Sequence, residues 1–154
     1  MVNYRLRELN QIIDDLIFEI DRNAAYRLDL EKCKRMAERL VEFSEKCPEC
    51  ELHLITLEKR MRGLSKQHLP LEGPELRDHN KFIREISSHL QKKHGLVPKG
   101  AYITIFMSIG IGVGLILGQI FFENIAIGMP IGLGVGIAIG AALDMDAEKK
   151  GKSF

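Results

Sequence analysis

Two pairs of residues in this 154-residue chain have the types and spacing of metal ligands. Cys47 and Cys50 form a Cys-x2-Cys pair in the stretch KCPECELH, and His89 and His94 form a His-x4-His pair in SHLQKKH. Thiolate sulfur and imidazole nitrogen are donors that zinc prefers, and both spacings occur in structural zinc sites. The gap between the two pairs is too long for an ordinary zinc finger, so the fold must bring them together.

The remaining histidine and cysteine near this pattern have different expected roles. His53 follows Cys50 by three residues on the same side of a helix, which makes it an alternative ligand in place of either distant histidine. Cys33 does not fit, because a helix over residues 33–47 places it about 20 Å from Cys47. Its position in an apolar stripe predicts a small core residue.

The cysteine pair leaves two other interpretations open. Cys47 at a helix N-cap and Cys50 in the first turn would lie near free amides and the helix dipole, which lower a thiol pKa and favour redox chemistry. CPEC also looks like the dithiol of thioredoxin-type proteins, but those carry it after a strand of a βαβ unit, and this sequence predicts no strand. The second interpretation is structural, because Cys50 and His89 also occupy core-facing positions. Three cysteines, an odd number, favour free thiols or a metal site over a disulfide framework.

The apolar spacing of the first 95 residues predicts the elements that must position these side chains. Apolar residues recur at steps of three and four, which indicates helices with one buried face, near 3–22, 26–46, 48–63 and 75–92. Pro48 and Pro74 suit the first turns of the last two. The expected fold class is all-α, with a small cytoplasmic four-helix bundle over residues 1–95. If the fourth helix returns antiparallel along the third, its two histidines arrive beside the two cysteines.

The remainder of the chain has the composition of a membrane segment. Residues 100–143 carry one acidic or basic side chain, Glu123. The uncharged run 101–122 matches a hydrocarbon core of about 30 Å, and a second apolar run reaches residue 143. We therefore expect a linker at 96–100, a transmembrane helical hairpin at 101–143 in a lipid bilayer, and a tail at 144–154. Lysines before and after the hairpin predict that both termini are cytoplasmic.

Glycines recur at every fourth position of both apolar runs. Each would cost a helix in water about 1 kcal/mol relative to alanine, but in lipid small residues let two helices approach closely. We expect glycine-zipper packing of the hairpin, and a second smooth face at Gly112 and Gly134 that favours a homo-oligomer. The predicted helix-packing residues are Gly110, Gly114, Gly118, Gly128, Gly132, Gly136 and Gly140.

Charge and motifs exclude several function classes. The chain has 22 Lys plus Arg against 21 Asp plus Glu, so it lacks the basic excess of a nucleic-acid-binding protein. The start MVNYRLRELNQ has no apolar core after a basic end, so no cleavable signal peptide is expected. No hydrolase triad, phosphate-binding glycine loop or nucleotide motif is present, and we expect no enzyme activity.

The succession of CPEC, SHLQKKHGLVPKG and an apolar hairpin ending in IGLGVGIAIGAALD resembles small bacterial membrane proteins of the bacillus type. Such proteins combine an N-terminal helical CxxC domain with a C-terminal glycine-zipper hairpin. The resemblance implies a location in the bacterial inner (cytoplasmic) membrane. It implies no activity, ligand or protein partner.

Three hypotheses from different classes follow. The first is a membrane-anchored helical interaction or regulatory module that oligomerises through its glycine faces and holds a structural zinc. The second is a small oligomeric channel or membrane-permeabilising protein. The third is a membrane-tethered thiol redox sensor.

Overall fold

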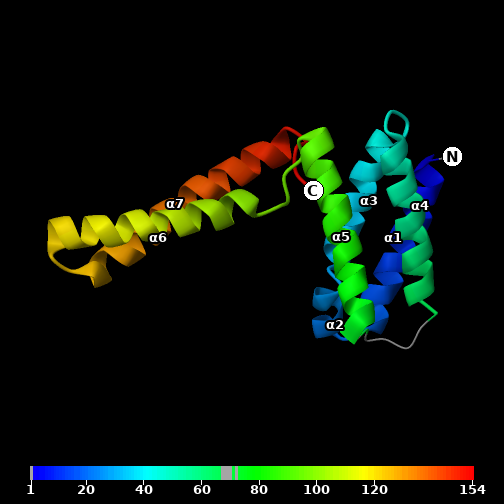
Figure 1. Ribbon diagram of the computed structural model, residues 1–154, viewed down its shortest axis with the longest axis horizontal. Helices are drawn as coiled ribbons and strands as arrows, with labels where there is room; N and C mark the ends of the chain where they lie inside the picture. Colours follow the sequence, from blue (N-terminus) through cyan, green and yellow to red (C-terminus); the bar gives the residue numbers. More distant parts are fainter. Residues whose placement is uncertain (1, 67–70, 72) are drawn as a thin grey trace. The chain divides into compact units, whose positions relative to one another are not determined.

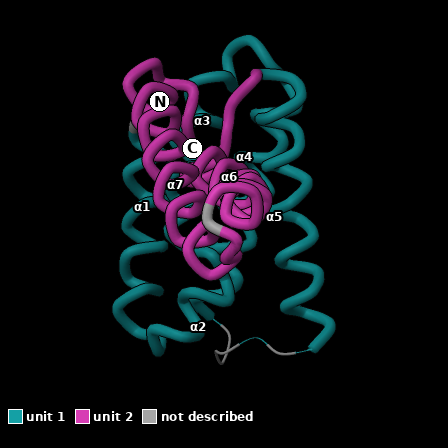
Figure 2. The backbone as a smooth tube through the Cα atoms, turned by 90° about the vertical axis from the view of Figure 1, so that its left-hand side faces the viewer, with its two compact units in different colours: residues 1–94 teal, residues 95–154 magenta. Residues whose placement is uncertain are grey.

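The computed structural model describes residues 2–66, 71 and 73–154, and its elements there are seven helices. The chain divides into two compact units, residues 1–94 and residues 95–154, which are coloured separately in Figure 2. Five helices belong to the first unit and two to the second (Figure 1). The all-α class predicted from the sequence is confirmed.

The first unit is a bundle organised around one central helix. Its helices are α1 (Val2–Glu19), α2 (Arg22–Arg27), α3 (Leu30–Ser44), α4 (Pro48–Leu64) and α5 (Gly73–His94). Helix α3 packs against α1, α4 and α5, so apolar side chains from all four long helices meet around it. Fully buried members of this core include Ile13, Met36, Leu57 and Ile86, one from each of these helices.

The prediction of one continuous helix over residues 26–46 is wrong before residue 30, where the structure has a break. The structure has a short helix α2 and a separate helix α3, so the described part of the unit has five helices where the sequence predicted four. Asp21 starts α2, its side chain accepting a hydrogen bond from the Asn23 amide at 3.2 Å. Asp29 then adopts a left-handed conformation with φ of 52°, which an α-helix does not allow. The apolar spacing continues through this break and therefore conceals it.

A buried histidine holds α5 against the break between α2 and α3. His79 is 2% exposed, and its Nε2 atom lies 2.9 Å from the carbonyl oxygen of Leu28. Burial lowers the pKa of His79, because the protonated ring would lose its hydration. His79 is thus a neutral core histidine with a satisfied hydrogen bond.

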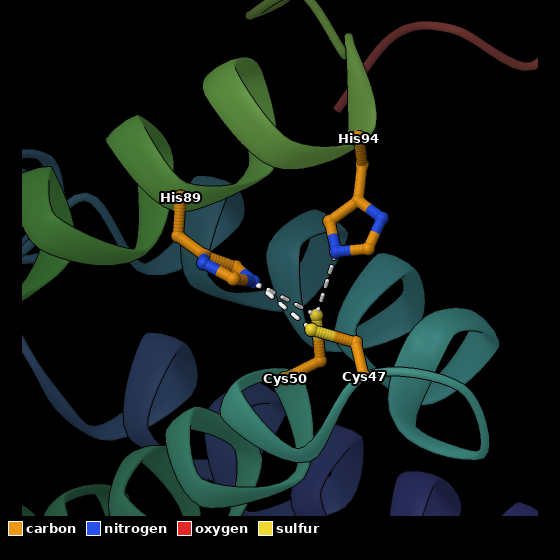
Figure 3. Close-up of side chains that lie close together, drawn as sticks. All are labelled: Cys47, Cys50, His89 and His94. Atoms are coloured by element: carbon orange, nitrogen blue, oxygen red, sulfur yellow. Dashed lines mark hydrogen bonds between the residues drawn. The ribbon is translucent and has the colours of Figure 1, made fainter.

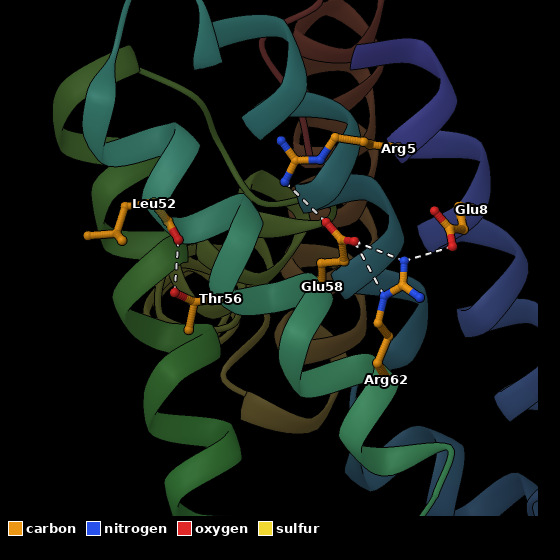
Figure 4. Close-up of polar contacts among 6 residues, drawn as sticks. All are labelled: Arg5, Glu8, Leu52, Thr56, Glu58 and Arg62. Carbon is orange, nitrogen blue, oxygen red and sulfur yellow. Dashed lines mark hydrogen bonds and ion pairs between the residues drawn. The ribbon is translucent and has the colours of Figure 1, made fainter. Parts of the chain in front are cut away.

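Ion pairs connect α1 to α4 on the surface of the bundle. Glu58 of α4 lies between Arg5 and Arg62, at 3.1 and 3.0 Å, and Arg62 also contacts Glu8 at 2.7 Å (Figure 4). Partial burial raises the pKa of Glu58, but hydrogen bonds from both arginines outweigh it, so the pKa lies below its usual range. Exposed pairs of this kind each stabilise a protein by about 0–1 kcal/mol.

The second unit is a hairpin of two long apolar helices. Helices α6 (Ala101–Phe122) and α7 (Ile125–Lys149) run antiparallel side by side, joined by a turn at Glu123 and Asn124 (Figure 1). The Asn124 side chain accepts a hydrogen bond from the Ala126 amide at 3.0 Å and so begins α7. Helix α7 extends six residues beyond the predicted end at residue 143, so the first half of the expected tail is helical.

Two contacts fasten the open end of this hairpin. The carboxylate of Asp144 on α7 accepts hydrogen bonds from the amides of Tyr102 and Ile103, at 3.3 and 3.0 Å. It thereby caps the N-terminus of α6, whose own N-cap residue is a glycine without a side chain. Val97 and Ser153 form a parallel bridge, with the Val97 amide donating to the Lys152 carbonyl at 2.8 Å.

Glycines line the contact between α6 and α7. A Cβ atom built on Gly118 would lie 2.8 Å from the Cα of Gly128, and one built on Gly132 would lie 2.6 Å from the Cα of Gly114. The same backbone-to-backbone approach holds for Gly110, Gly136 and Gly140. By contrast, a Cβ on Gly112 or Gly134 would meet nothing within 4 Å. Side chains on the inner face would therefore separate the two helices, whereas side chains on the outer face would not.

Both helices of the hairpin are long and apolar enough to cross a membrane. Their candidate spans are Ala101–Phe121 and Ile125–Lys149, each with a mean hydropathy of 2.0. Only 11% and 17% of the two apolar windows are buried, whereas the core helix of a water-soluble protein is mostly buried. Large apolar side chains such as Ile116, Ile120 and Ile131 are more than half exposed. An exposed apolar surface of this extent is typical of membrane or protein interaction sites.

Candidate metal centre

The two cysteines and two histidines that the sequence singled out lie together within the first unit. One ligand atom from each of Cys47, Cys50, His89 and His94 lies within 4.8 Å of all the others. The Cys50 sulfur is 3.2 Å from Nε2 of His89 and 3.1 Å from Nε2 of His94, and the Cys47 sulfur is 3.5 Å from Nε2 of His89. All four side chains converge on one point (Figure 3).

The site is formed where the N-terminus of α4 meets the C-terminus of α5. Cys47 is the N-cap of α4, Pro48 follows as its first residue, and Cys50 lies in the first turn. His89 and His94 belong to the last two turns of α5, of which His94 is the final residue. A helix N-terminus favours negative groups such as thiolates, and a helix C-terminus favours cations. The two helix ends therefore suit a dithiolate and a metal cation.

The distances match those of a tetrahedral metal site. Zinc–sulfur bonds of about 2.3 Å and zinc–nitrogen bonds of about 2.0–2.1 Å require sulfur–nitrogen separations of roughly 3.5 Å at tetrahedral angles. Three of the four sulfur–nitrogen pairs lie 3.1–3.5 Å apart, and all four donor atoms lie within 4.8 Å of one another. The group could therefore hold a single metal ion.

Burial determines the protonation states around the site. Cys50 is 0% exposed, and this burial, together with the adjacent Cys47 side chain, raises the pKa of the Cys50 thiol to about 12. Burial also lowers the pKa values of His89 and His94, and each ring has a second histidine beside it that lowers its pKa further. Neutral imidazoles have a lone pair free to bind a metal, and a coordinating metal deprotonates a thiol outright. Without a metal, a thiol with so high a pKa is a poor nucleophile.

Two further residues shape the site, and sequence reasoning missed both. Glu49 places a carboxylate oxygen 3.1 Å from Nδ1 of His89, on the side of the ring away from the sulfurs. Phe43 stacks on the ring of His94, with centroids 4.1 Å apart and an angle of 22° between the planes. Glu49 lies inside the CPEC motif itself, and metal-ligating histidines commonly donate their other N–H to a carboxylate. That rule could have identified it, but nothing in the sequence points to Phe43.

The other residues considered from the sequence lie outside this group. The ring of His53 is 5.2 Å from that of His89, centroid to centroid, so His53 borders the site without joining the four ligands. Cys33 is fully buried in the core, with its sulfur 3.8 Å from the Leu28 carbonyl oxygen, as its apolar position predicted. All three cysteines are free thiols.

Comparison of the chain with protein-family models, with curated proteins and with solved structures gave no match.

Proposed function

We propose that this protein is a membrane-anchored helical interaction or regulatory module whose cytoplasmic bundle is fastened by a structural zinc ion. The observation that carries this proposal is the convergence of Cys47, Cys50, His89 and His94 on one point between two helix ends. A site with four protein ligands leaves no open position for substrate or water, which is typical of structural zinc and not of catalytic zinc. We accordingly propose no enzyme activity.

Zinc is the metal that these donors favour. Two thiolates and two imidazoles in a tetrahedral arrangement are typical of zinc, whereas calcium and magnesium require oxygen ligands. Two thiolates also balance the charge of a divalent cation. The bound ion would tie the start of α4 to the end of α5, which are separated by about forty residues of chain, and its binding free energy would add to the stability of the bundle.

The apolar hairpin supports the membrane part of the proposal. In water its exposed isoleucines would be a liability, but in a bilayer they would face lipid. The antiparallel pairing of α6 and α7 leaves residue 101 and residue 149 at the same end of the hairpin. With the flanking lysines, this arrangement supports a hairpin whose two ends face the cytoplasm, and we propose the inner membrane of a bacterium.

We further propose that copies of the protein associate in the membrane. The outer faces of α6 and α7 carry Gly112 and Gly134, where a neighbouring helix could approach closely. The pocket between α6 and α7 is lined by glycine, valine, leucine, isoleucine and phenylalanine. This apolar lining favours a packing surface over an ion conduit.

The thiol redox sensor is the second candidate function, favoured by the proximity of the two cysteine sulfurs. In that case the pair would form a disulfide on oxidation, and the histidines would not be needed for it. Metal content and thiol titration separate the two functions. Bound zinc with both thiols protected from alkylation supports the zinc module, and a metal-free chain with a reversible disulfide supports the sensor.

The test uses the full chain extracted from membranes in a mild detergent under reducing conditions. We expect it to remain in the membrane fraction after an alkaline wash and to carry about one zinc ion per chain by elemental analysis. Native mass spectrometry is expected to show a defined oligomer, and reconstituted vesicles are expected to show no ion flux. Recovery in the soluble fraction, or a chain that contains no zinc, would overturn the membrane or the metal part respectively.

A further inference from the structure

We infer that Glu49 is a positioning residue that orients His89 toward the metal, and this inference rests on the zinc centre proposed above. Its carboxylate oxygen lies 3.1 Å from Nδ1 of His89. The other ring nitrogen, Nε2, points toward the two sulfurs, at 3.2 Å from Cys50 and 3.5 Å from Cys47. The imidazole is therefore held between a carboxylate on one side and the ligand cluster on the other.

This arrangement assigns the tautomer of His89. A metal-bound imidazole uses the lone pair of one nitrogen and carries its proton on the other. Since Nε2 faces the sulfurs, the proton belongs on Nδ1, from which it is donated to Glu49. A carboxylate in this position fixes the ring orientation and raises the basicity of the ligating nitrogen, which strengthens the bond to the metal.

His94 is held by a different kind of contact. Its ring stacks on Phe43 with centroids 4.1 Å apart, and the stack restricts rotation of the ring without setting its proton. Glu49, by contrast, directly contacts His89. Its loss should weaken zinc binding without abolishing it.

Glu51, two residues after Glu49, provides a matched control. Glu49 and Glu51 are both exposed and both lie in the first turn of α4, so each interacts in a similar way with the helix dipole. Only Glu49 lies between the two cysteines and reaches His89. A difference between variants at these two positions would isolate the contact with His89 from a general effect of charge.

The experiment measures zinc affinity of the detergent-purified full chain by competition with a chromophoric chelator. We expect Glu49→Ala to weaken zinc binding by about 10–100-fold, the range found for outer partners of metal-ligating histidines. Glu49→Gln should lose less zinc affinity than Glu49→Ala, because its amide oxygen can still accept a hydrogen bond from the Nδ1–H of His89. Glu51→Ala should change the affinity by no more than about twofold. The d–d absorption bands of bound Co(II) should shift in Glu49→Ala and stay unchanged in Glu51→Ala.

The outcomes separate this inference from the proposed function. Equal affinities and identical Co(II) spectra for Glu49→Ala and Glu51→Ala, with a wild type that binds zinc, would overturn the role of Glu49 alone. A wild-type chain that binds no zinc would overturn the metal centre and this role with it. Unfolding of the metal-free variants should be the same, since both side chains are exposed, and a large loss in Glu49→Ala would show a structural role instead.

Discussion

Cys33 and Cys50 are both fully buried thiols, but their neighbours give them different roles. Burial raises the pKa of each to about 12, so neither is reactive as a free thiol at neutral pH. Cys33 contacts the Leu28 carbonyl in the apolar core, whereas Cys50 contacts two imidazole nitrogens. The identity of the neighbours, more than burial, thus distinguishes a core cysteine from a candidate ligand.

We predict that Cys33→Ala retains zinc and that Cys50→Ala loses it. Loss of the Cys50 sulfur removes the donor atom nearest to both histidines, while Cys33 does not belong to the group of four converging ligands. Cys33→Ala should still lower stability by about 1 kcal/mol, since it leaves a small cavity. Elemental analysis and thermal unfolding of the two variants check both statements. Zinc lost from Cys33→Ala, with the fold intact, would contradict the ligand assignment.

At the residue scale, the sequence predicts ligand types well and their supporting partners poorly. The spacing of Cys47, Cys50, His89 and His94, together with an antiparallel return of the chain, was enough to predict that they meet. The contacts of Glu49 and Phe43 depend on side-chain rotamers and on the distance between two helices. Periodicity carries no information on either quantity.

At the scale of elements, the helix count shows where apolar spacing fails as a guide. The stripe of apolar residues places α4 and α5 within a few residues of their observed bounds. It does not reveal the break before α3, because that break depends on the left-handed conformation of a single residue, Asp29. The buried contact between His79 and Leu28, which holds α5 at this break, was also invisible in the sequence.

His79 should make the stability of the bundle depend on pH. Its pKa is lowered in the folded chain, so the unfolded state binds more protons once the pH falls below about 6.5. The neutral ring therefore contributes fully to the free energy of unfolding above that pH. This contribution is lost as the pH falls through the folded-state pKa. His79→Gln keeps a donor for the Leu28 carbonyl but does not titrate. We expect metal-free wild type to lose stability relative to His79→Gln on acidification, measured by chemical unfolding from pH 7.5 to about 5.

Parallel pH profiles for these two proteins would contradict this role of His79. Metal-free samples are needed because acid also protonates the zinc ligands and releases the ion. Since neither protein then contains zinc, any difference between the profiles reports the titration of residue 79.

The glycine face of the hairpin gives a second prediction at this scale. We expect Gly132→Leu to separate α6 from α7, because its side chain would meet the backbone of Gly114, at a cost of at least about 1–3 kcal/mol. Gly136→Leu should act in the same way against Phe106. Gly134→Leu is the matched control, since a side chain there meets nothing within 4 Å. Distances between spin labels on α6 and α7, in a background without native cysteines, measure the separation.

The same variants distinguish packing within a hairpin from packing between copies. If the outer face mediates assembly, Gly134→Leu should reduce the oligomer while the label distances stay unchanged. Unchanged label distances in Gly132→Leu would show that α6 and α7 do not rely on close glycine contact.

At the scale of the whole molecule, the chain combines two units that are stabilised by different kinds of contact. The bundle of residues 1–94 is small, and a domain of this size buries a modest apolar core. The hairpin of residues 95–154 has few buried apolar side chains, and its two helices meet through glycine contacts and are long and apolar enough to cross a membrane. Composition alone predicted this division, because residues 100–143 carry a single acidic or basic side chain, Glu123.

X-ray absorption at the zinc edge of the purified full chain identifies the atoms bound to the metal. We expect a first shell of two sulfurs at about 2.3 Å and two nitrogens at about 2.0–2.1 Å, with the scattering pattern of imidazole. A shell of oxygen ligands only, or one with three or four sulfurs, would contradict a centre formed by Cys47, Cys50, His89 and His94.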